Sequence, residues 1–309
     1  MNVLPAMAVG MALAFNMALV TAPSASADDV AGLVDIGGGR SLYLNCQGNA
    51  PPGSPTVFVI PGKGSYAEAW NAAVPPDDPI RSSPYDVIDQ AQLELDPESA
   101  QPIVAQTTRI CVYDRPNTRP DGTELSTAVP QPHTLQSDVD DVVRLVDAAQ
   151  LPTPMVFVAH SYGGLILDLL ARQHPDLVSG LVFSEPTSEF IWGIGTPEKD
   201  AAFDADGRAG PAGDEAILAE DAFAAIADAP PLPRVPSIVL SAEKFPAPST
   251  LKPDNYTQAQ IRQSNDMLAA ALGTTNVVIP GTGHNQMLYE PRAIADEIMT
   301  VVDEVRTGN

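Results

Sequence analysis

A serine between a strand-like run and a helix-like run is the residue of this sequence best suited to nucleophilic chemistry. Residues 155–159 are apolar and strand-like, and apolar residues then recur at helical spacing until Pro175. Ser161 lies at the sharp turn between the two runs, where a strained backbone exposes the hydroxyl. Such a turn accepts only small neighbours, and Ala159 and Gly163 meet that demand. The pattern predicts a nucleophilic serine.

A serine nucleophile needs a base, and His284 is the histidine best placed to supply it. It follows a strand-like run at 276–279 and a short loop that contains glycine. The other three histidines lie in the serine turn, in a polar loop and just before a helix-ending proline: His160, His133 and His174. We therefore expect His284 to reach Ser161 across the ends of the strands.

Attack on a carbonyl also needs N–H groups that bind the developing oxyanion. An apolar run at 57–60 ends in Pro-Gly-Lys-Gly, whose glycines allow the backbone to approach a substrate closely. We expect two main-chain donors, the N–H of Lys63 in this loop and the N–H of Tyr162 directly after the serine.

The elements that must position these residues form an alternating pattern of strands and helices. Such alternation predicts a mostly parallel sheet with helices on both faces. Seven strand candidates occur, at 41–46, 56–60, 109–113, 155–159, 180–184, 237–241 and 276–279. Asp138, Asp140 and Asp141 open a helix after the third candidate, and we interpret them as helix-start residues, not as a metal site. A last helix is predicted from Pro291.

Two long segments interrupt the alternation. The first, at 65–106, is rich in proline and aspartate. The second, at 187–235, contains one predicted short helix near 215–227. An excursion of this length beside a serine site is typical of a cap or lid.

Taken together, these features resemble the α/β-hydrolase fold family from about Ser41 to Val305. The resemblance rests on the order of serine before histidine and on the motifs at 61–64, 113–116, 159–164 and 281–284. It implies an α/β fold with a mostly parallel sheet of about eight strands. It also implies a cap inserted after the sixth strand, which places 187–235 over the active site.

The acid of the family's catalytic triad departs from the common pattern. Members commonly place an aspartate shortly after the seventh strand, and Phe245 takes that place here. Phenylalanine cannot orient an imidazolium ion, so another carboxylate must serve. Glu185 ends the preceding strand, where some lipases of the fold carry their acid, and Glu243 lies two positions before the common site. We favour Glu185, with Glu243 as the alternative and the lack of any true acid as a third reading.

The N-terminus predicts export. An almost wholly apolar run at 3–20 precedes a small-x-small cleavage pattern at 25–27, which indicates a signal peptide at 1–27 and a hydrolase domain at 28–309. An uncleaved membrane anchor is the alternative. An exported chain with two cysteines, Cys46 and Cys111, favours a disulfide between them. A pair of buried free thiols is the alternative. Their strands resemble an exported bacterial branch of the family in which the two cysteines fall on neighbouring strands.

The charge balance limits the classes of partner. The chain has 16 basic and 39 acidic side chains, a formal net charge of −23, which repels nucleic acid and anionic membranes. The sequence therefore predicts a secreted serine hydrolase that cleaves carboxylic esters, with a small-molecule ester or lipid as substrate and with no metal or organic cofactor. An amidase, peptidase or acyltransferase would use the same residues and stays open, as does a non-catalytic binding member of the fold.

Overall fold

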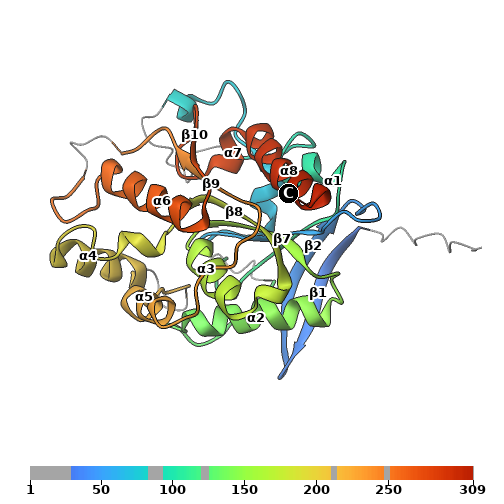
Figure 1. Ribbon diagram of the computed structural model, residues 1–309, viewed down its shortest axis with the longest axis horizontal. Helices are drawn as coiled ribbons and strands as arrows, with labels where there is room; N and C mark the ends of the chain where they lie inside the picture. Colours follow the sequence, from blue (N-terminus) through green and yellow to red (C-terminus); the bar gives the residue numbers. More distant parts are fainter. Residues whose placement is uncertain (1–28, 83–92, 120–124, 210–213, 247–250, 309) are drawn as a thin grey trace, which may run out of the picture.

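The computed structural model describes residues 29–82, 93–119, 125–209, 214–246 and 251–308. The predicted signal peptide, 1–27, lies outside these residues. An eight-stranded sheet runs through the centre of the described part, in the order β1-β2-β6-β3-β7-β8-β9-β10 (Figure 1). Its strands are β1 (Val30–Gly37), β2 (Arg40–Gln47), β3 (Val57–Ile60), β6 (Ile110–Tyr113), β7 (Met155–Ser161), β8 (Val178–Pro186), β9 (Ser237–Ala242) and β10 (Asn276–Ile279).

The sheet is mostly parallel. β2 pairs antiparallel with β1 and β6, and the other neighbouring strands are parallel. A parallel strand covered on both faces needs apolar residues throughout, and β3 is buried at all four positions. The predicted fold class, a mostly parallel eight-stranded α/β sheet, is confirmed. β1 is the strand that the seven sequence candidates do not include.

Helices cover both faces of the sheet (Figure 1). One face is covered by α2 (Leu135–Ala148), α3 (Gly163–Gln173) and α6 (Gln258–Leu272), and the other by α1 (Ala100–Ala105) and α8 (Pro291–Thr307). α2 begins after the N-cap Thr134 and buries a stripe that includes Val139 and Val142. α8 begins at Pro291, as predicted. Within the described ranges, no helix has both the length and the apolar character that a membrane span requires.

The two long segments contain short elements in their described parts. The connection at 65–106 holds η1 (Ala67–Asn71), β4 (Ala72–Ala73), η2 (Pro79–Ser82), β5 (Glu94–Leu95) and α1. The segment between β8 and β9 holds η5 (Glu189–Ile191), α4 (Pro197–Arg208) and α5 (Ala219–Ala227). The helix predicted over 215–227 therefore begins at Ala219, because Glu215 instead turns inward to a buried arginine. α4 has no buried residue and thus no apolar stripe, so the sequence pattern does not reveal it.

The predicted disulfide is present. Cys46 on β2 and Cys111 on β6 are directly opposite each other in the antiparallel ladder, and their sulfur atoms are bonded. The two cysteines thus fall on neighbouring strands, as the resemblance implies. The bond ties the N-terminal edge of the sheet to its centre.

The topology creates a crevice at the carboxyl edge of the sheet. β3 lies between β6 and β7. After β3 the chain first forms β6 on one side of it and later forms β7 on the other side. Such a switch point leaves open space where the loops that follow β3 and β7 diverge. The predicted oxyanion loop follows β3, and Ser161 ends β7.

Candidate active site

Ser161 lies at the turn from β7 into α3. Its φ of 53° is in the left-handed region, which residues other than glycine rarely adopt. Two glycines make room for the turn. A Cβ atom on Gly163 would come within 2.4 Å of the carbonyl oxygen of Ile60, and one on Gly62 would come within 2.8 Å of Ser161 Cβ. β3 and the loop after it thus leave no room for a side chain at Gly163, and the loop itself has no room for one at Gly62.

His284 reaches Ser161 from the loop after β10. Its Nε2 atom lies 2.9 Å from Oγ of Ser161. Burial lowers the pKa of His284 to about 4, so the imidazole is neutral near pH 7 and can accept a proton. The structure therefore brings together the serine and the histidine that the sequence singles out, across 123 positions of chain.

A second histidine, His160, supports the first. Its Nε2 donates to the main-chain carbonyl of His284 over 2.8 Å. Burial, together with the nearby His284, lowers the pKa of His160 to about 3, so this ring is also neutral. The sequence indicates His160 only as part of the turn and does not predict this contact. No residue spacing in the sequence indicates this hydrogen bond, because the acceptor is a backbone atom on a distant loop.

The two candidate acids have different surroundings. Glu185 is buried at the end of β8, has a φ of 41°, and accepts from the N–H of Ala242 over 2.6 Å. It lines the same cavity as Ser161 and His284. Glu243 is exposed, and its carboxylate accepts from the N–H of Gly281 over 2.9 Å.

The predicted oxyanion donors face the same region. The loop at 61–64 passes over Ser161, and Lys63 and Ser161 line two cavities in common. Among the described residues, neither the main-chain N–H of Lys63 nor that of Tyr162 has a hydrogen-bond acceptor. Both donors are therefore open to a substrate oxygen.

A known family matches this arrangement. The sequence model of the alpha/beta hydrolase family matches residues 57–297, more than half of the chain. The chain belongs to the alpha/beta hydrolase family. Solved structures with a similar fold include a putative lipase from Acinetobacter baumannii, at a TM-score of 0.59 and 13% identity over 91% of this chain and 93% of that one. Another is a thermophilic esterase from Thermogutta terrifontis, at a TM-score of 0.57 and 16% identity over 91% of this chain and 100% of that one. At these identities the likeness concerns the fold alone.

The relatives found by sequence are much longer proteins. A probable transporter, efuK, of Hormonema carpetanum is 26% identical over 166 residues, which is 52% of this chain. The chain spans less than a fifth of the length of the curated relatives it matches, 16% and 19%.

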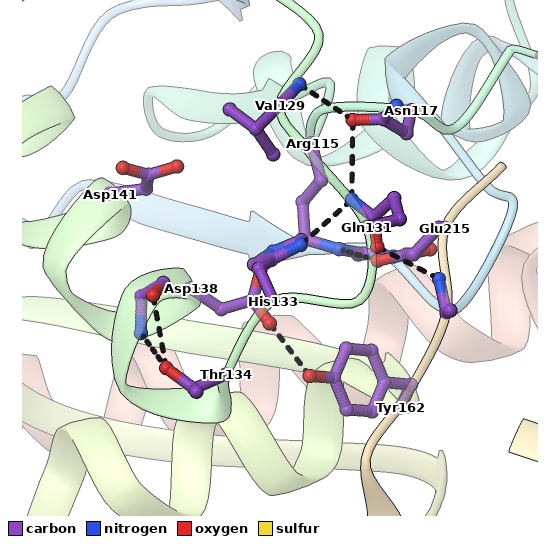
Figure 2. A network of polar contacts seen from close by, with 12 residues as sticks. Arg115, Asn117, Val129, Gln131, His133, Thr134, Asp138, Asp141, Tyr162 and Glu215 are labelled. Atoms are coloured by element: carbon purple, nitrogen blue, oxygen red, sulfur yellow. Dashed lines mark hydrogen bonds and ion pairs between the residues drawn. The ribbon is translucent and has the colours of Figure 1, made fainter. Parts of the chain in front are cut away.

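In this alpha/beta hydrolase, a polar network lies behind the serine turn (Figure 2). The Tyr162 hydroxyl donates to Asp138 over 2.6 Å, and Nε2 of His133 lies 2.7 Å from the same carboxylate. Burial, with Asp138 nearby, raises the pKa of Tyr162, which keeps the phenol protonated as a donor. Gln131 continues the network, with its amide nitrogen on His133 Nδ1 and its oxygen accepting from the N–H of Ala216.

Two aspartates of the predicted acidic cluster at the start of α2 have partners beyond their own helix. Asp138 lies in the first turn of α2, as predicted, but its carboxylate is buried against a tyrosine and a histidine. Asp141, in the next turn, binds Arg40 of β2. In the part of the chain that the structure describes, no group of three or more potential ligands is placed to hold a metal ion.

A buried ion pair joins this network. Arg115, in the motif at 113–116, contacts Glu215 over 2.8 Å, and the two side chains are 1% and 2% exposed. Burial alone would lower the pKa of Arg115, but the Glu215 carboxylate raises it above its ordinary value, so the guanidinium stays charged. The sequence pattern predicts a functional role for neither Arg115 nor Glu215.

Three cavities meet at Ser161. Their volumes are about 380, 250 and 440 Å³. The first is lined mainly by apolar side chains, among them Ile191, Phe203, Phe245 and Ile261. The second lies between Lys63, Tyr162 and α4, and the third extends toward Tyr66 and Leu288.

Of the apolar run at 190–194, one residue lines one of these three cavities. Ile191 lines the first cavity, whereas Trp192 stacks on Phe223 of α5 at a centroid distance of 5.0 Å. Phe203, on the unpredicted helix α4, lines two of the three cavities. The inserted segment therefore forms part of the cavity wall, both through α4 and through residues outside it such as Thr187 and Ile217.

Proposed function

We propose that the chain is an exported serine hydrolase that cleaves carboxylic esters. The observation that carries the proposal is the 2.9 Å approach of His284 Nε2 to Ser161 Oγ at a strained turn that opens into three cavities. Among the solved neighbours, the printed names of an esterase and a putative lipase make esters the first substrate class to test.

In the proposed mechanism, neutral His284 takes the proton of Ser161 while Oγ attacks the ester carbonyl. The main-chain N–H groups of Lys63 and Tyr162 bind the negative oxygen of the tetrahedral intermediate. His284 then protonates the leaving alcohol, and a water activated by the same ring releases the acid from the acyl-enzyme. Glu185 orients the imidazole and stabilises its charged form. No step needs a metal or an organic cofactor.

Export is the second part of the proposal. The small-x-small pattern at 25–27 supports it, and so does the Cys46–Cys111 bond, because disulfides persist in oxidising compartments. A small-molecule ester or a lipid fits the first cavity, which combines apolar side chains such as Phe203 and Ile261 with polar groups at Ser161 and His284.

The decisive experiment combines covalent labelling with turnover. We expect a fluorophosphonate probe to add its mass to the peptide that contains Ser161, and p-nitrophenyl esters of graded acyl length to be hydrolysed. Ser161→Ala should abolish both, whereas Ser137→Ala, at a half-buried position in the first turn of α2, should change neither.

Two results would contradict the proposal. Wild-type protein that is folded but neither labelled nor active would favour a non-catalytic binding member of the fold. Turnover that survives in Ser161→Ala would assign the chemistry to other residues. Labelling with hydrolysis of amides but not esters would shift the substrate class and leave the residues in place.

A further inference from the structure

We propose that Arg115 and Glu215 are positioning residues that set the direction of the Lys63 oxyanion donor. This inference rests on the proposed function, because it assigns a cause to the geometry of the same site. It concerns two residues that lie behind the oxyanion loop at 61–64, with Arg115 and Glu215 side by side in the network (Figure 2).

The guanidinium of Arg115 is shared between a carboxylate and the loop. On the carboxylate side, Nε and Nη2 donate to Glu215 over 2.9 and 2.8 Å. On the loop side, Nη2 donates to the carbonyl of Gly62 over 2.7 Å, and Nη1 donates to the carbonyl of Pro61. All three nitrogens are therefore engaged, and two consecutive carbonyls of the loop are held in fixed directions.

Fixing the Gly62 carbonyl also fixes the Lys63 N–H. The two groups belong to one planar peptide unit, which is not among the cis bonds of the described chain. In a trans peptide the C=O and N–H bonds point in opposite directions. With the carbonyl turned toward Arg115, the N–H of Lys63 must point away from Arg115, and the loop passes Ser161 closely.

Glu215 holds the other side of the same donor. Its Oε2 atom accepts from the N–H of Gly64 over 3.0 Å, so the residues before and after Lys63 are both held by one ion pair. Glu215 belongs to the segment between α4 and α5. The Lys63 ammonium adds a second link to that segment, because it donates to the carbonyls of Gly207 and Ala209 at the end of α4 over 2.9 Å.

The energetics favour a positioning role over a purely stabilising one. A buried ion pair gains little net stability over well-packed apolar residues of similar size. An apolar pair, however, could not offer directed hydrogen bonds to three backbone groups of the loop. The bidentate fork of arginine supplies those directions, and a lysine cannot reproduce them.

The test is Arg115→Lys, which keeps the charge and loses the fork. We expect kcat to fall about 100-fold, the loss typical of one misplaced oxyanion donor, while KM changes by less than about threefold. Binding of a trifluoromethyl ketone, which forms a tetrahedral oxyanion on Ser161, should weaken by the same factor as kcat/KM. If Arg115 only balanced the charge of Glu215, lysine would preserve that role and Arg115→Lys would keep the wild-type kcat.

Arg172→Lys is the matched control. Arg172 also binds two carboxylates, those of Asp168 and Glu189, and is 11% exposed, but its hydrogen bonds run to α3, η5 and Pro230. This variant should keep the wild-type kcat and ketone affinity.

A second variant covers the case in which Arg115→Lys does not fold. Glu215→Asp keeps the charge and withdraws the carboxylate by one methylene, and we expect kcat to fall about tenfold. Folded variants with wild-type kcat and wild-type ketone affinity would overturn the inference. An inactive, unlabelled wild-type protein would instead overturn the proposed function, so the two failures are distinguishable.

Discussion

Backbone strain is concentrated at two residues of the site. Ser161 and Glu185 both have positive φ values, 53° and 41°, and neither is a glycine. Each such conformation costs on the order of 1–3 kcal/mol and persists only where the surroundings enforce it. They end neighbouring strands, and the register of β7 and β8 shifts between His160 and Ser161, where Ser161 lies opposite Pro186. The strain thus turns a hydroxyl and a carboxylate toward one cavity.

The first prediction separates the two candidate acids. Glu185→Gln should lower kcat by about 100-fold or more, because a neutral amide cannot stabilise the imidazolium that forms on His284. Glu243→Gln is the matched control, and its exposed side chain should change kcat by less than about twofold. Initial rates on a p-nitrophenyl ester measure both. A large loss at Glu243 alone would reverse the assignment.

The residues of the site differ in how far the sequence predicts them. Ser161 and His284 follow from local patterns, since each lies in a short strand-to-loop signature. The choice of acid needs three-dimensional information, because Glu185 and Glu243 both lie at strand ends and differ in where the side chain points. His160 could not be assigned, because its partner is a main-chain oxygen 124 positions away.

The starts of two helices are joined directly behind the serine turn. Tyr162 is the N-cap of α3, and its hydroxyl donates to Asp138 in the first turn of α2. The carboxylate is buried, so its two oxygens need donors, and the second donor group is the His133 ring. The link fixes the direction in which α3 leaves the turn.

Removing the Tyr162 hydroxyl tests this link between α2 and α3. Tyr162→Phe removes the hydroxyl and leaves a buried carboxylate oxygen of Asp138 without its partner, which should destabilise the protein by about 1–3 kcal/mol. Because the main-chain N–H of Tyr162 stays, kcat should change by less than about tenfold. Urea denaturation measures the stability. The control is Tyr43→Phe, where the half-buried hydroxyl has no partner among the described residues and the change should stay below about 0.5 kcal/mol. Equal stability of the two variants would contradict the prediction.

A buried apolar face helps to predict an element but does not suffice. α1 and α6 bury apolar residues such as Val104 and Leu268 and are still not among the predicted elements. All seven strand candidates are present, whereas β1 is an edge strand that exposes Val30 and Leu33. α4 similarly lacks buried residues. The start of α5 is misplaced for a different reason, since Glu215 serves the ion pair with Arg115 and not the helix.

The fold as a whole keeps two histidines from protonation, the buried His160 and the half-buried His284. The rings of His160 and His284 are tilted against each other at a centroid distance of 4.8 Å, and burial lowers their pKa values to about 3 and about 4. The unfolded chain has no such burial, so its histidines titrate near 6.5. The molecule also carries groups with the opposite behaviour. Burial raises the pKa of Asp168 to about 7. Below that pH the folded protein binds a proton at Asp168 more tightly than the unfolded chain does, so this group stabilises the fold as the pH falls.

A comparison with one variant isolates the histidine contribution. His160→Gln keeps a nitrogen that can donate to the His284 carbonyl but has no group that titrates. Below pH 6.5 the unfolded wild-type chain binds a proton at position 160 that the folded protein excludes until about pH 3, so wild-type stability falls as the pH falls. Between pH 7 and 4 the wild type should therefore lose about 3 kcal/mol relative to the variant, at about 1.4 kcal/mol per pH unit below 6.5. Urea denaturation of both proteins at pH 7, 5.5 and 4 measures the difference, in which the contribution of Asp168 cancels. Parallel stability curves would mean that the folded protein admits the proton, and that the ring beside His284 is not held neutral by burial.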